Sequence, residues 1–117
     1  MIQPREIKRL KGKTKINLVF SKVKVIKSGD LNLYYVNKDD GFQNIEVGVG
    51  VSKKFVLLAT RRNRIKRQIN GVIQKQNFQV IPVLSEGLYM IVYKGGLTVK
   101  SESIWKDLKG LLSHFDS

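Results

Sequence analysis

The sequence has no cysteine and a single histidine, His114, among its 117 residues. Without cysteine there can be no disulfide, no zinc ribbon and no thiol chemistry. One histidine makes neither a metal centre nor a catalytic triad, and near the end of a C-terminal helix its simplest role is to interact with the helix dipole. Asp39 and Asp40 have the chemistry of Mg²⁺ ligands, but next to Gly41 they are more typical of a turn. We therefore expect no catalytic residue and no metal site on the protein.

Long apolar runs are also missing. No segment approaches the ~18–20 apolar residues that a membrane span needs, and the most basic segment carries only small aliphatic residues, without the Trp or Phe of an interfacial anchor. Residues 1–13 contain five basic residues with no apolar stretch behind them, so nothing marks the chain for secretion. We expect a cytoplasmic protein that has neither a membrane partner nor a small-molecule substrate.

Acidic residues are scarce. There are 9 Asp and Glu against 22 Lys and Arg, which gives a formal net charge of +13. Self-repulsion of this size is tolerated mainly by proteins whose partner is a polyanion, so nucleic acid is the expected partner. The length suits one domain of the usual ~100–200 residues, and a chain of this length can bury a hydrophobic core that is stable without disulfides or bound metals. We predict a single RNA-binding domain over residues 1–117, with a basic arm over residues 1–13.

The densest positive charge lies in residues 61–67, where five of seven side chains are cationic. Aliphatic residues in and after this segment recur at i, i+4, i+7 and i+8: Ile65, Ile69, Val72 and Ile73. This spacing predicts an amphipathic helix that begins near Thr60, with Arg64 and Arg67 pointing away from the core. Such a helix holds guanidinium groups at fixed separations, and guanidinium groups match phosphate oxygens bidentately. We therefore expect contact with an RNA backbone.

A short helix and a strand are predicted ahead of this segment. Thr14 is a suitable N-cap for a helix with an apolar face that ends at Phe20. Residues 31–36 alternate as a strand does, so that Leu33 and Tyr34 point to opposite faces.

The clearest alternation in the chain lies in residues 45–51, where Ile or Val alternates with Glu46, Gly48 and Gly50. It predicts a strand with one nearly bare face. Glycines there allow another backbone, a helix or a ligand to come close, and both close packing and ligand contact remain open. Residues 53–60 are ambiguous between an apolar connection and an early start of the basic helix.

Residues 88–93 predict an apolar strand suited to the interior of a sheet. Ser101 or Ser103 can cap a last helix whose apolar stripe reaches Phe115. The elements follow in the order α, β, β, an optional short strand, α, β, α. We predict an α+β sandwich, one sheet with helices packed on it.

Two motifs at a fixed spacing resemble a known family. Residues 47–54 read Val-Gly-Val-Gly-Val-Ser-Lys-Lys, and after a short apolar link residues 62–67 read Arg-Asn-Arg-Ile-Lys-Arg. A strand ending in Ser-Lys-Lys, followed by a helix opening with Arg-Asn-Arg, is the pattern of the bacterial ribonuclease P protein component. The similarity extends to the arm ending in Leu10 and Lys11, to the first helix, and to the last strand and helix.

The resemblance implies a four-stranded sheet with packed helices in the order α-β-β-β-α-β-α, a fold also found in the second domain of a ribosomal protein. It also implies a left-handed βαβ crossover through the basic helix. The chain would be a basic subunit that joins a large catalytic RNA to remove the 5′ leader of precursor tRNA by an endonucleolytic cut. The RNA would carry out the hydrolysis with Mg²⁺, which agrees with the missing protein catalytic groups.

The resemblance also implies which residues meet the ribonuclease P RNA and the precursor tRNA. The RNA-binding residues would be Arg61, Arg62, Asn63, Arg64, Lys66 and Arg67, together with Ser52, Lys53 and Lys54 at the strand end. A cleft between the first helix and the sheet would hold the single-stranded leader, with Phe20, Tyr34 and Ile16 as its lining. Aromatic faces stack on unpaired bases without requiring a particular sequence. Core packing is the alternative role for Phe20, and Ile16 takes a position that is often aromatic in the family.

The link between the motifs departs from the family. Relatives have Gly-Asn-Ala-Val or similar there, whereas residues 55–60 read Phe-Val-Leu-Leu-Ala-Thr, with one extra residue.

Two other classes of protein share some of these features. A ribosomal or RNA-chaperone protein would explain the charge but not both motifs. A DNA-binding protein could place the helix of Arg64 in a major groove, but no helix-turn-helix pair precedes it.

Overall fold

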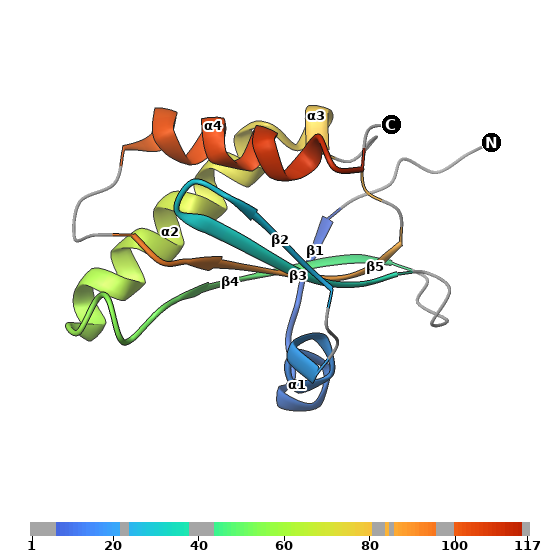
Figure 1. Cartoon of the computed structure of the whole chain (residues 1–117), viewed down its shortest axis with the longest axis horizontal. Coiled ribbons are helices and arrows are strands. Elements are labelled where there is room, and N and C mark those ends of the chain that lie inside the picture. Colours follow the sequence, from blue (N-terminus) through green and yellow to red (C-terminus); the bar gives the residue numbers. More distant parts are fainter. Residues whose placement is uncertain are drawn as a thin grey trace.

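The computed structural model describes residues 7–21, 24–37, 44–80, 84, 86–95 and 100–115, except the side chains of Asn37, Asn77 and Phe78. Its centre is a five-stranded sheet in the order β1-β4-β5-β3-β2 (Figure 1). The strands are β1 (Ile7–Arg9), β2 (Val25–Ser28), β3 (Leu31–Asn37), β4 (Ile45–Val51) and β5 (Gly87–Tyr93). Residues 1–6 of the predicted arm and the turn expected at Asp39–Gly41 lie outside the described residues.

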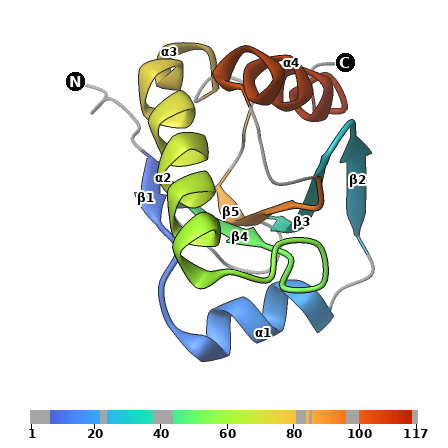
Figure 2. The ribbon, with the colours of Figure 1, turned by 90° about the vertical axis from the view of Figure 1, so that its left-hand side faces the viewer.

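Helices cover both faces of the sheet (Figures 1 and 2). Helix α1 (Lys13–Ser21) lies on one face, and α2 (Ala59–Lys75), α3 (Asn77–Val80) and α4 (Ser101–Leu112) lie on the other. Strands β4 and β5 are parallel, so that α2 and α3 form the crossover between them. The predicted α+β sandwich is confirmed, while the left-handed sense of the crossover stays a prediction.

The alternation of side chains along the strands gives the sheet two cores. The larger core joins the odd-numbered residues of β4 to the apolar stripes of α2 and α4. The smaller core lies under α1 and consists of Leu10, Val19, Val36 and Leu88, with Ile16, Tyr34 and Met90 packed against it. Leu33 belongs to the first core and Tyr34 borders the second, as the period of two predicts.

Helix α1 packs on β3 and β5, on the same side of the sheet as the even-numbered residues of β4. Lys15 of α1 contacts both carboxylate oxygens of Glu46, with Nζ–O distances of 3.0 and 3.1 Å. A Cβ on Gly48 would lie 2.8 Å from the Met90 sulfur and 3.2 Å from Leu10 Cβ. At Gly48, the bare face is therefore used for close packing of neighbouring side chains.

The sheet has five strands, and the prediction of four was wrong. The order α-β-β-β-α-β-α is present from α1 to α4, but β1 precedes it and α3 is inserted after α2. The optional short strand expected after β4 is also absent, because residues 53–58 form a loop and the additional strand is β2. Strands of three and four residues are too short to show a periodic signal, and β1 forms only because its backbone pairs with β4 in parallel.

The predicted helix caps were also wrong. Thr14 is the second residue of α1, and Lys100, not Ser101 or Ser103, holds the N-cap position of α4. Leu58 occupies the same position in α2, and neither Leu58 nor Lys100 makes a side-chain capping hydrogen bond. Burial of the apolar stripes therefore fixes where these helices lie, with no help from a capping side chain.

The loop between β4 and α2 is anchored at two points. Val56 is fully buried, and its N–H donates to the carbonyl oxygen of Ser52 at 3.0 Å. Arg62, on the first turn of α2, donates from Nη1 to the carbonyl oxygens of Val56 and Leu57 at 2.9 and 2.7 Å. The guanidinium group thus holds the loop against the helix.

We expect Arg62→Met to lower the free energy of unfolding by about 1–3 kcal/mol, because it removes two charge-assisted hydrogen bonds. Arg61→Met is the matched control, since Arg61 is exposed one position earlier. It should change stability by less than about 0.5 kcal/mol. Urea denaturation followed by circular dichroism measures both, and equal costs would show that Arg62 does not stabilise the loop.

Candidate nucleic-acid interface

The first half of α2 presents a row of cations to solvent. Its buried residues are Ile65, Ile69, Val72 and Ile73, as the spacing predicted. Because this stripe faces the sheet, Arg61, Asn63, Arg64 and Arg67 are exposed on the other sides of the helix. The first turn holds no acidic residue, and the N–H groups there add the positive end of the helix dipole.

Two of the predicted RNA-binding residues on α2, Lys66 and Arg62, are less accessible to solvent than the exposed cations of the row. Lys66 is half-buried and turned toward the sheet edge, and the Arg62 guanidinium is occupied by the loop carbonyls. Ser52 is half-buried after β4, and Lys53 and Lys54 are exposed in the loop that follows. The Lys54 ammonium lies 6.0 Å from the centre of the Phe55 ring.

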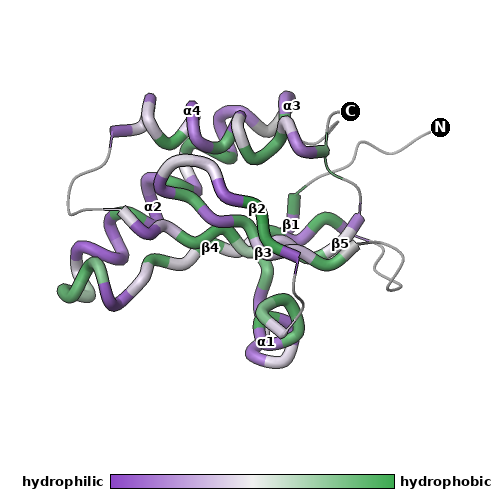
Figure 3. Tube along the Cα trace, viewed as in Figure 1, coloured by the Kyte–Doolittle hydropathy of each residue, from purple (hydrophilic) through white to green (hydrophobic). Residues whose placement is uncertain are grey.

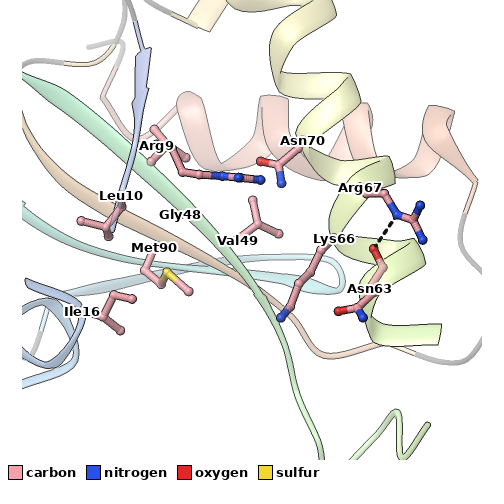
Figure 4. Close-up of a pocket in the computed structure, with 11 residues that line it drawn as sticks. Arg9, Leu10, Ile16, Gly48, Val49, Asn63, Lys66, Arg67, Asn70 and Met90 are labelled. Atoms are coloured by element: carbon pink, nitrogen blue, oxygen red, sulfur yellow. Dashed lines mark hydrogen bonds between the residues drawn. The ribbon is translucent and has the colours of Figure 1, made fainter. Parts of the chain in front are cut away.

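A groove of about 470 Å³ opens between α2 and the edge of the sheet (Figure 4). Its polar lining comes from Arg9 of β1 and from Asn63, Lys66, Arg67 and Asn70 of α2. Its floor is apolar and consists of Leu10, Ile16, Val47, Gly48, Val49 and Met90. None of these lining residues is acidic, so the groove combines three cations and two amides with an uncharged floor.

The groove exists because β1 is short. Strand β1 pairs with β4 only as far as Val47, where the Leu10 N–H donates to the Val47 carbonyl oxygen at 3.0 Å. Gly12, with a φ of +98°, then lets the chain leave the sheet before α1. Beyond Val47, the outer edge of β4 therefore opens into the groove.

On the face of the sheet that carries α1, Phe20, Tyr34 and Lys94 form an aromatic platform. The Phe20 and Tyr34 rings lie 4.8 Å apart between centroids at an angle of 60°. Lys94 donates from Nζ to the Tyr34 hydroxyl at 3.2 Å, and the same nitrogen lies 5.8 Å from the Tyr34 ring centre. Phe20 is 43% exposed and stands outside both cores, so core packing does not account for it.

Lys94 also sets the ionisation of Tyr34. Burial raises the pKa of Tyr34, but the hydrogen bonds with Lys94 and Asn32 and the positive charges of Lys94 and Lys27 outweigh burial and leave the pKa below its ordinary value. The Asn32 side-chain amide is oriented so that its nitrogen donates to the Leu31 carbonyl oxygen and its oxygen accepts from Lys94 Nζ at 3.0 Å. Lys94 therefore donates to Asn32 as well as to Tyr34. The ammonium is thus held beside the ring, at a fixed position on the sheet.

The groove and the platform are linked through neighbouring residues on adjacent strands. Tyr34 of β3 is the cross-strand partner of Met90 of β5, and Met90 is the partner of Gly48 of β4. Met90 and Gly48 also line the groove. A path therefore crosses the strands from the edge of β4 to the Tyr34 ring, next to α1. Ile16, expected in the leader cleft, lines the groove end of this path.

Three polar residues of this surface escaped the sequence analysis: Arg9, Asn70 and Lys94. Arg9 fell within the basic arm, where nothing distinguished it from its neighbours. Lys94 comes next to Tyr34 only through the pairing of β3 with β5. Asn70 had one available signal, because it lies seven residues after Asn63 on the same side of α2.

Two classes of site are not seen in the described part of the chain. No group of three or more His, Cys, Asp and Glu residues there could hold a metal ion. None of the described helices has the length and apolarity that a membrane crossing requires.

Comparison with known proteins identifies the family and supports the fold. The family described as ribonuclease P matches residues 5–116. The RNase P protein of Staphylococcus aureus has a similar structure, with a TM-score of 0.69 and 20% identity over 91% of this chain and 93% of that chain. A mutant of that protein with defective mRNA degradation activity has a TM-score of 0.72 and 19% identity over 92% of this chain and 87% of that chain.

No curated protein matches the sequence directly. The structural similarity, at about a fifth of residues identical, supports the fold. The family match covers both motifs and every helix and strand of the structure. This chain therefore belongs to the ribonuclease P protein family.

Proposed function

We propose that this chain is the protein subunit of a ribonuclease P ribonucleoprotein. In this proposal it binds the catalytic RNA through the exposed cations of α2 and the 5′ leader of precursor tRNA along the path from the groove to the aromatic platform. It thereby assists the endonucleolytic removal of the leader, in the cytoplasm. The observation that carries the proposal is the pairing of two unlike surfaces on one small fold, one cationic and one aromatic.

The chemistry of α2 suits a folded RNA. Arg61, Arg64 and Arg67 are exposed on one helix, so they can meet phosphates at fixed spacings without any ordering of the backbone on binding. This surface is therefore suited to the large RNA partner.

The path across the sheet suits a single strand. Arg9 and Lys66 can neutralise phosphates at the groove, and the Phe20 and Tyr34 rings can stack on unpaired bases at the other end. Stacking accepts any base, which is what the variable leaders of many precursor tRNAs require. We further propose that Mg²⁺ acts on the RNA subunit, where the hydrolysis takes place, and that the protein contributes binding and positioning.

Cleavage of precursor tRNA, with and without the protein, in the presence of a ribonuclease P RNA tests this function. We expect the RNA with the protein to cleave precursor tRNA with a higher kcat/KM than the RNA alone, and the protein alone to cleave nothing. If the protein binds RNA but leaves cleavage unchanged, a general RNA-binding or RNA-chaperone function replaces the proposal.

We expect Arg64→Ala with Arg67→Ala to weaken binding of the catalytic RNA with little change in thermal stability. If each arginine neutralises one phosphate, the slope of log K against log salt should become shallower by about 0.7–0.9 per residue. Lys100→Ala with Lys106→Ala removes the same charge from exposed positions of α4 and its N-cap, and is the control. Equal effects of the two double substitutions would argue against an RNA surface on α2.

We expect Tyr34→Ala to reduce the preference of the holoenzyme for precursor over mature tRNA by about one to two decades, because one stacked base contributes roughly 1–3 kcal/mol. Assembly with the catalytic RNA should be almost unchanged. Tyr34→Phe keeps the ring and loses only the hydrogen bond to Lys94, so it should retain most of the preference. Loss of assembly with an unaltered preference would instead place Tyr34 at the interface with the catalytic RNA.

A further inference from the structure

The loop before α2 carries three exposed hydrophobic side chains, which together we name the apolar tip. Phe55 is 51% exposed, Leu57 is 79% exposed and Leu58 is 58% exposed. The loop lies at one end of the long axis of the molecule, next to the start of α2 (Figures 1 and 3). Single exposed hydrophobic residues are common, but three within four positions form an exposed apolar patch, and such patches mark interaction sites.

The tip is held in place by the rest of the loop. Val56, between Phe55 and Leu57, is fully buried, and Arg62 binds the carbonyl oxygens of Val56 and Leu57. The backbone of the tip is therefore fixed before any partner arrives. A preorganised apolar surface binds more tightly than a flexible one, because less conformational freedom is lost on binding.

The charges around the tip indicate the kind of partner. Lys53, Lys54 and Arg61 flank it and are exposed, and the Lys54 ammonium lies 6.0 Å from the Phe55 ring centre. The start of α2 adds the positive end of its dipole, without an acidic residue in the first turn. The complementary partner presents apolar faces within a field of negative charge. Unpaired nucleobases between phosphates have both properties.

We propose that the apolar tip is a second base-binding site, which takes unpaired nucleotides of an RNA by stacking on Phe55 and packing on Leu57 and Leu58. This inference rests on the proposed RNA-binding function and adds to it a contact that neither α2 nor the aromatic platform makes. The loop that carries the tip is separate from α1, which carries Phe20 of the platform, because the loop lies at the end of the molecule whereas α1 lies below the middle of the sheet (Figure 1).

A second copy of this chain is the less suitable occupant. Two apposed tips would bring Lys53, Lys54 and Arg61 of both copies together, between molecules that each carry a formal charge of +13. Repulsion among these groups opposes the small apolar contact that the tips would form. The unpaired base is the occupant that the charges favour.

The test compares two probes with equal phosphate charge. One is an oligoadenylate of about ten nucleotides, within the size range of single-strand sites, and the other is the same oligomer with an abasic ribose at every position. Binding is measured by fluorescence anisotropy in a Phe20→Ala, Tyr34→Ala background, which removes stacking on the platform. We expect this background to bind the adenine oligomer about tenfold more tightly than the abasic one.

Adding Phe55→Ser and Leu57→Ser should abolish this preference while leaving the affinity for the abasic oligomer and its salt dependence unchanged. Leu18→Ser is the matched control, since Leu18 is exposed on α1 outside the tip, and it should retain the preference. Circular dichroism melting checks the fold. If Phe55→Ser lowers the melting temperature, Leu57→Ser alone decides the result, because its side chain is the most exposed of the three.

Four outcomes would overturn the inference. An adenine preference that survives the tip substitutions would place the bases elsewhere on the protein. A sedimentation coefficient that falls from dimer to monomer with Leu57→Ser would show that a second copy covers the tip. Failure of the unsubstituted protein to bind either oligomer would count against the proposed RNA-binding function itself, whereas tight binding of both without a tip effect would leave that function standing.

Discussion

The arrangement of charge on this protein depends on one packing contact, that of the aliphatic stripe of α2 on the valine face of β4. Ile65, Ile69, Val72 and Ile73 are buried there, and each such side chain contributes roughly 1.5–3 kcal/mol by leaving water. This burial offsets the cost of placing five cations on the first turns of the helix. It also fixes the rotation of α2 about its axis, and that rotation decides which cations face solvent and which, like Lys66, face the groove.

The same contact explains how far the sequence could predict the structure. The helix of α2 and the strand of β4 are long and strongly periodic, so their positions and buried faces could be read from the spacing alone. Strands β1 and β2 are formed by pairing with distant strands, and no local pattern indicates such partners. The starts of α1 and α4 were misplaced because α1 already begins at Lys13, before the predicted cap Thr14, and no capping side chain marks the start of α4.

In the candidate site, too, some features follow from local periodicity and others depend on contacts between distant segments. The exposure of Arg64 and Arg67 follows from helix periodicity, and the side of the strand on which Tyr34 lies follows from the period of two. The hydrogen bonds of Lys94 to Tyr34 and of Arg62 to the loop carbonyls follow from neither, because each depends on how separate segments meet. Arg62 shows that a motif residue can stabilise the fold while its neighbours on the helix remain available to a ligand.

The short β1 strand has a consequence for self-association. An unpaired strand edge is a template for another chain, and β4 would present a long apolar edge if β1 were absent. The three residues of β1 cover the first half of that edge, and Lys8 and Arg9 add positive charge to the cover. In a cell, proteolytic trimming of the first ten residues would therefore both remove Arg9 from the groove and open β4 to aggregation.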